Sequence, residues 1–172
     1  MTLLTVYRHL PKMAAVIERT VDKRAVSSMR TGRKSTLEQL EELCALIAEK
    51  EFYRELAVKL KEVLDSLSEE DRLLLEYKYF RRKDASRYEK IHPETRTYYR
   101  KQNRAYDAFL LQLLSRGMSQ KWFNENALAC DLLREQHRRV LIARMHIQKA
   151  AEARRAAAKE KRVKKDVGAR YS

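Results

Sequence analysis

The stretch that decides the fold is LSEEDRLLLEYKYFRRKDASRYEKIHPETRTYYRKQNRAYDAF, residues 67–109. Ser68 and the acidic residues after it are typical of a helix start, and leucines and aromatic residues follow at helical spacing. Pro93 interrupts the pattern, which then resumes and ends at Gly117, a residue typical of helix C-terminal caps. We therefore predict one apolar helix, a short helix over 85–91, and a longer helix that has Pro93 in its first turn and stops at Gly117.

The helix after Pro93 has two chemically different faces. The face that we expect to pack in the core carries Tyr98 or Tyr99, Gln102, Ala105, Tyr106, Phe109, Leu110 and Leu113. The opposite face carries Arg96, Arg100, Asn103 and Arg104. Arg96 and Arg100 are one turn apart and point in the same direction. Because arginine can bind a guanine edge through two hydrogen bonds and asparagine can bind adenine, this face predicts contact with base pairs.

The order of these elements is that of a helix-turn-helix. In such a motif the last helix enters the DNA major groove with its N-terminal residues first. Side chains beside the base-reading positions then contact phosphates and fix the register. The residues that we expect to serve in this way are Thr95, Thr97 and Lys101, together with Arg81, Arg82 and Lys83 before the short helix.

The same stretch resembles region four of bacterial sigma factors, a DNA-binding region, and the phage and bacterial regulators that keep only this module. The resemblance is carried by LSEEDRLLLEYKYF, residues 67–80, and by TRTYYRKQNRA, residues 95–105. It implies packing positions at Tyr98 and Ala105, RNA polymerase as a partner, and DNA-facing positions at Thr95, Arg96, Thr97, Arg100 and Lys101. Since it covers about 45 of the 172 residues, we expect a sigma-like regulator and not a complete sigma factor.

Charge is distributed unevenly outside this module. The net charge is +14, yet residues 35–71 hold 11 acidic and only 4 basic side chains. Residues 1–34, 72–121 and 132–172 each have an excess of Lys and Arg. Such asymmetry indicates a polyanionic partner, nucleic acid above all. From Lys149 onward the chain is rich in Ala, Lys and Arg, which favours an exposed basic extension, helical or frayed.

Helical spacing continues on both sides of the module. Pro11 predicts either a bend in the first helix or a break after a short first turn, and Ser35 or Thr36 predicts a cap for a helix over 37–66. On this helix we expect the core to contain Leu40, Leu43, Cys44, Ile47, Leu56, Leu60, Val63 and Leu67. Ser119 predicts the cap of one continuous last helix. Its packing residues are expected to be Trp122, Leu128, Leu132, Leu133, Val140, Ile142 and Ile147.

The sequence thus predicts an all-α helical bundle that contains a helix-turn-helix and ends in a long basic helix. Three regions are expected: N-terminal helices over 1–66, the DNA-binding module over 67–117, and a C-terminal helix with its extension over 118–172. Three glycines and two prolines are too few for a many-stranded sandwich or barrel. No apolar run approaches the roughly 18 residues of a membrane span, and no secretion signal is evident at the start. With only two cysteines, we expect a cytoplasmic protein.

No catalytic or metal-binding pattern is evident. The chain has no glycine-rich phosphate loop and no His-Glu zinc motif, and its four histidines are scattered. We therefore expect no enzymatic activity, no cofactor and no metal. The leading hypothesis is a sequence-specific transcription regulator that binds double-stranded DNA. The alternatives are a basic helical protein associated with RNA or the ribosome, and an interaction scaffold whose acidic helix docks a basic partner or a second copy, as in a homodimer.

Overall fold

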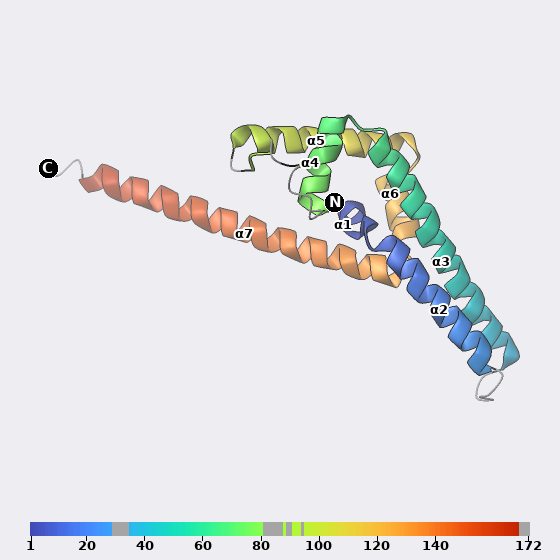
Figure 1. Ribbon diagram of the computed structural model, residues 1–172. Coiled ribbons are helices and arrows are strands. Elements are labelled where there is room, and N and C mark those ends of the chain that lie inside the picture. The colour runs from blue at the N-terminus through green and yellow to red at the C-terminus, as the bar shows by residue number, and fades with distance from the viewer. Residues whose placement is uncertain (29–34, 81–87, 89–90, 94, 169–172) are drawn as a thin grey trace.

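The computed structural model describes residues 1–28, 35–80, 88, 91–93 and 95–168, with side chains as far as residue 153. Throughout this part the regular elements are helices, which confirms the all-α fold (Figure 1). They are α1 (Thr2–Tyr7), α2 (Leu10–Ser28), α3 (Thr36–Asp65), α4 (Glu69–Tyr79), α5 (Arg96–Ser115), α6 (Gln120–Trp122), the π-helix η2 (Phe123–Ala127) and α7 (Asp131–Gly168). Arg81, Arg82, Lys83 and most of the short helix predicted over 85–91 lie outside the described residues.

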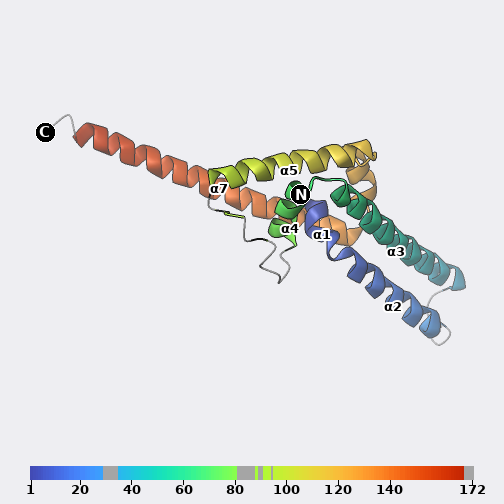
Figure 2. The same ribbon diagram turned by 45° about the horizontal axis from the view of Figure 1, so that its top comes forward.

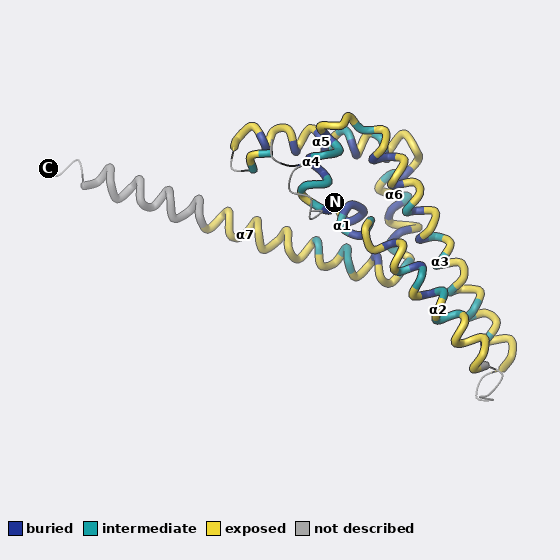
Figure 3. The backbone as a smooth tube through the Cα atoms, in the orientation of Figure 1, coloured by how far each residue is buried: buried dark blue, intermediate teal, exposed yellow. Residues whose placement is uncertain are grey.

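The helices meet at one end of a two-helix arm. Helices α2 and α3 lie side by side to form the arm, and α4 and α5 pack together beyond its base (Figures 1 and 2). The start of α7 lies beside α1, and the rest of α7 projects away from the body (Figure 1). Buried residues gather where these elements meet (Figure 3). The largest fully buried side chains there include Leu4, Leu10, Tyr53, Leu56, Leu60, Leu75, Phe109 and Leu133, so all three predicted regions contribute to one core.

The helix boundaries follow the capping residues in the sequence. Ser35 forms a capping box with Glu38, and the Ser68 hydroxyl accepts a hydrogen bond from the Asp71 amide at the start of α4. At the end of α5, Gly117 has φ +75°, and the amides of Gly117 and Met118 donate to the carbonyls of Leu114 and Leu113, both at 3.0 Å. This is a Schellman cap, which confirms the predicted stop. Of the two outcomes predicted at Pro11, a bend or a break, the structure shows a break, since α1 ends before it at Tyr7 and α2 begins at Leu10.

The outer half of α3 contradicts the predicted core. Leu40 is 57% exposed, and Ile47 and Cys44 are exposed as well. In the arm, α3 packs mainly along α2, and a pair of helices buries only one narrow seam. The buried residues of α3 therefore belong to its second half, near the body: Tyr53, Leu56, Leu60, Val63 and Leu64.

The prediction of one continuous last helix is also wrong. Ser119 caps α6 as expected, but the chain passes through η2 and then breaks before Asp131. Arg134 holds the break, because its guanidinium donates to the carbonyls of Leu128 at 3.1 Å and Ala129 at 3.3 Å. Leu133 is buried as predicted. Leu132, Ile142 and Ile147 are exposed instead, and residues 141–153 are exposed throughout, because α7 touches the body along one side only and then projects from it.

Candidate nucleic-acid interface

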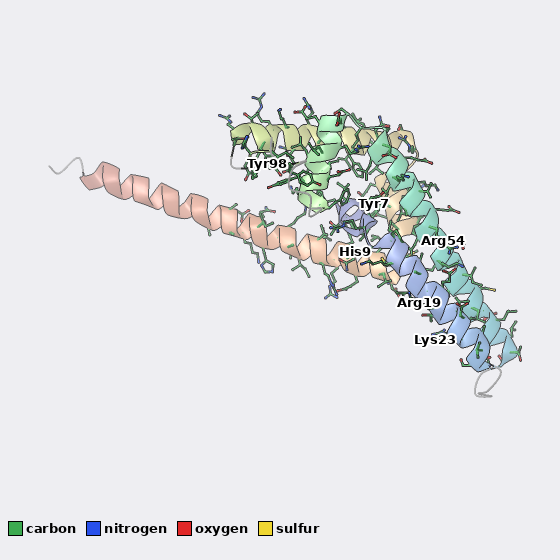
Figure 4. All side chains as sticks on the ribbon, viewed as in Figure 1. Tyr7, His9, Arg19, Lys23, Arg54 and Tyr98 are labelled. Carbon is green, nitrogen blue, oxygen red and sulfur yellow. The ribbon has the colours of Figure 1, made fainter. Side chains whose placement is uncertain are left out.

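Helix α5 rests on α4 through the face that the sequence predicts. Its buried residues are Tyr98, Gln102, Ala105, Phe109 and Leu113. Of the two adjacent tyrosines, Tyr98 is therefore the one that packs inward (Figure 4). Tyr99 is 58% exposed, and Leu110, which was predicted to pack, is exposed as well. Since a helix turns by about 100° per residue, neighbouring positions cannot share one narrow buried face.

The start of α5 is fixed by Thr95. Its side chain accepts a hydrogen bond from the Tyr98 amide at 3.2 Å and donates to the His92 carbonyl at 2.9 Å. The helix thus begins at Arg96 and not in the turn that contains Pro93, as had been predicted. The Thr95 hydroxyl, a predicted phosphate contact, is already used within the chain. Its main role is to hold the first turn of α5 in place.

Four of the predicted interface residues are exposed on the first turns of α5. They are Arg96, Thr97, Arg100 and Asn103. The part of the chain that the structure describes offers these side chains no hydrogen bond or ion pair. Tyr99 lies on the same turns, with its ring centroid 5.4 Å from that of Tyr98. From the sequence, Tyr98 and Tyr99 were alternatives for the core, and Tyr99 was not assigned to the interface. The available signal was that only one of two adjacent helical residues can pack inward, so the other must face outward.

Lys101 and Arg104 differ from their neighbours, because acidic residues of α4 bind them. The Lys101 ammonium lies 2.6 Å from a Glu70 carboxylate oxygen, and the Arg104 guanidinium lies 2.6 Å from the other oxygen and 3.3 Å from Asp71. Hydrogen bonds from Lys101 and then Arg104 lower the pKa of the Glu70 carboxyl. The hydrogen bond to Glu70, followed by that to Asp71, raises the pKa of Arg104. These two predicted DNA contacts thus join α5 to the first turn of α4.

A second polar network lies between α4 and α5, with Gln102 and Tyr98 buried and Lys78 at its exposed edge. The Lys78 ammonium donates to the Gln102 side-chain oxygen at 3.0 Å, and the Gln102 amide donates to the Tyr98 hydroxyl at 3.0 Å. The ammonium also lies 5.2 Å from the ring centroid of Tyr106 and 5.8 Å from that of Tyr79, which are cation–π distances. Burial, and then the charge of Arg144, lowers the pKa of Lys78, while burial raises the pKa of Tyr79 to about 12.

This network explains a polar residue on an apolar face. Gln102 was predicted to face the core, but no partner for its amide was predicted. The only available signal was an amide at a core-facing position of one helix and a cation, Lys78, near the end of the other. Since buried amides require hydrogen-bond partners, Gln102 fixes how α5 is rotated against α4. That rotation directs Arg96 and Arg100 away from the body.

Comparisons of the chain with protein-family models, with curated proteins and with solved structures gave no match. The described helices include none that is long and apolar enough to cross a membrane. Within the same residues, no group of three or more His, Cys, Asp or Glu side chains is arranged to hold a metal ion. The candidate interface is therefore defined by its own geometry: a helix start fixed on its inner side, with outward basic and amide side chains that have no partner among the described residues.

Proposed function

We propose that the protein is a sequence-specific DNA-binding transcription regulator in which α5 serves as the recognition helix of a region-four-like module. The observation that carries this proposal is the contrast across the first turns of α5. Thr95, Tyr98 and Gln102 fix the backbone of these turns, while Arg96 and Arg100 are exposed and unpaired in the described chain. A rigid backbone that carries free bidentate donors is well suited to reading base edges.

Each exposed side chain has a role in this proposal. Arg96 and Arg100 bind guanine edges, Asn103 binds adenine, and Thr97 donates to a phosphate. Lys101 and Arg104 lie beside them and contact phosphates only after exchanging their bonds with Glu70. Two further groups complete the DNA-binding set. Thr95 caps the recognition helix, and Arg81, Arg82 and Lys83 contact the neighbouring DNA strand.

The projecting part of α7 supplies affinity that does not depend on sequence. Residues 132–172 have 13 basic and 4 acidic side chains, and the helix continues to Gly168. If the protein as a whole engages about six phosphates, the logarithm of its affinity falls with the logarithm of salt concentration with a slope of about −5. The same proposal places the protein in the cytoplasm, with RNA polymerase as a partner and a homodimer as its oligomeric state. A polymerase pull-down and light scattering test the last two.

Selection from random duplex DNA at moderate salt tests the proposed function. The wild type is expected to retain a recurring motif, and the Arg96→Ala/Arg100→Ala variant is expected to retain DNA without it. The matched control is Arg116→Ala/Lys121→Ala, which removes the same charge from beyond the other end of α5 and should keep the motif. If the wild type retains DNA with no recurring motif, α5 does not read sequence.

A second candidate is a basic helical protein associated with RNA or the ribosome. It is favoured by the exposure of residues 141–153 on α7, since a long exposed basic helix suits the phosphates of structured RNA. This candidate predicts tight binding to structured RNA and little loss of it in Arg96→Ala/Arg100→Ala. Competition between an RNA hairpin and the selected duplex separates the two functions.

A further inference from the structure

The outward side of α2 carries a stripe of basic residues far from α5 in the chain. Lys12, Arg19 and Lys23 are exposed. Arg19 lies seven residues after Lys12, and Lys23 lies eleven residues after Lys12, which corresponds to about two and about three helical turns. They therefore lie on one face of α2. The residues that pack α2 into the core, Leu10, Ala14 and Ile17, lie on the opposite face. Arg19 and Lys23 are labelled along α2 in Figure 4.

Ion pairing divides the basic residues of the arm into two groups. Those that reach between α2 and α3 are paired: Arg24 binds Glu42 at 3.2 Å, and Arg54 binds Glu18 at 3.0 Å. Lys12, Arg19 and Lys23 have no acidic partner among the residues that the structure describes. Asp22 lies at the edge of this face, three residues after Arg19, but it forms no ion pair with Arg19 or Lys23 in the described chain. Among the described residues, the stripe thus carries three positive charges without an ion-pair partner.

We propose that this stripe is a second DNA-contacting surface, which binds the phosphate backbone of a duplex without reading its sequence. At a rise of 1.5 Å per residue, the three cations span about 16 Å along α2. Because each DNA strand winds around the duplex axis, a straight helix face meets only a few successive phosphates, and three long basic side chains over this span are enough to contact them. The exposed residues Val16 and Val26, which lie beside these cations on the face, carry no charge.

The inference rests on the proposed function only for its choice of duplex DNA as the partner. It requires neither that α5 read bases nor that a specific site exist. Binding to a duplex of random sequence therefore tests the stripe separately from recognition by α5. The measured quantity is the slope of log affinity against log salt concentration, because each phosphate contact contributes about 0.9 to that slope.

The stripe variant is Lys12→Gln/Arg19→Gln/Lys23→Gln in the full chain. The control is Arg54→Gln/Lys59→Gln/Lys121→Gln, which removes the same net charge from exposed residues that are paired with carboxylates. Both variants are first checked by circular dichroism for wild-type helix content and melting temperature. We expect the slope to lose about 2.7 in magnitude in the stripe variant and less than about 1 in the control.

Equal losses in the two variants would show an effect of net charge alone and would overturn the proposal, as would an unchanged slope in the stripe variant. Binding to vesicles that contain phosphatidylserine is measured in parallel. A loss confined to the vesicles would assign the stripe to an anionic membrane surface and overturn its assignment to DNA. Selection from random DNA could find no motif while the salt dependence of affinity still weakens in the stripe variant. In that case base recognition by α5 is contradicted, and the proposal of a second DNA-contacting surface on α2 is supported.

Discussion

The two faces of α5 use similar side chains in different ways. On the face toward α4, Lys101 and Arg104 are held by Glu70, and Gln102 is held by Lys78 and Tyr98. On the outward face, Arg96 and Arg100 have no partner in the described chain. The difference arises from the acidic residues that begin α4, because they lie within reach of only one side of α5. The acidic residues at the start of α4 thus determine which basic side chains of α5 remain available to bind a ligand.

The largest expected effect comes from the packed face. Phe109 is 1% exposed, and replacing it with alanine leaves a cavity in the core. Phe109→Ala should lower the free energy of unfolding by about 3–5 kcal/mol in denaturant titration. Leu111→Ala, an exposed position on the same helix, should change it by less than about 0.5 kcal/mol. Equal effects at the two positions would contradict the assignment of the faces.

Gln102 tests the polar network between α4 and α5. Gln102→Ala leaves the Lys78 ammonium and the Tyr98 hydroxyl without their shared partner, so it should lower the free energy of unfolding by about 1–3 kcal/mol. Asn103→Ala is the neighbouring control, which removes an exposed amide and should be near neutral in the same titration. A neutral Gln102→Ala would mean that the network does not fix α5 against α4.

Glu70 tests whether the two faces compete for cations. Glu70→Gln removes the charge that binds Lys101 and Arg104, so both become available to phosphates. Affinity for duplex DNA at low salt should rise about fivefold, and the salt slope should steepen by about 1–2. Glu69→Gln, which removes an adjacent carboxylate outside these ion pairs, should have the smaller effect in the same anisotropy assay. A weaker affinity in Glu70→Gln would mean that the ion pairs support the interface and do not occupy it.

The smallest expected effect is a pH dependence. Because its partners lower the pKa of Glu70 below the ordinary 4.5, the stabilisation that it contributes is present above pH 4.5. That stabilisation is lost as the pH falls through the lowered pKa. The melting temperature of the wild type should therefore exceed that of Glu70→Gln near neutral pH, and the two should converge in acid. A constant difference across this range would contradict the ion-pair assignment.

Much of the local structure could be predicted from the sequence. Ser35, Ser68 and Gly117 act as caps through contacts within a few residues, so their effect is readable from the chain alone. The packed face of α5 follows from helical periodicity in the same way. Periodicity does not reveal how far a partner helix extends, however. This is why Leu40 and Ile47 were wrongly assigned to the core.

The candidate site was less predictable for a similar reason. Exposure of Arg96 and Arg100 follows from the helical pattern, whereas the capture of Lys101 and Arg104 depends on Glu70, more than thirty residues earlier in the chain. Contacts of such separation have no local signature. The stripe on α2 became visible only when α3 was seen to cover the opposite face.

The most direct test of the account is the specificity ratio of the outward face. Affinities for the selected site and for a scrambled duplex are measured at the same salt concentration, for the wild type and for Arg96→Ala/Arg100→Ala. We predict that the ratio falls at least about tenfold in the variant, because each bidentate contact discriminates by about 1–3 kcal/mol. The free energy of unfolding should stay unchanged. A ratio that survives the double substitution would contradict the claim that the outward face of α5 reads DNA.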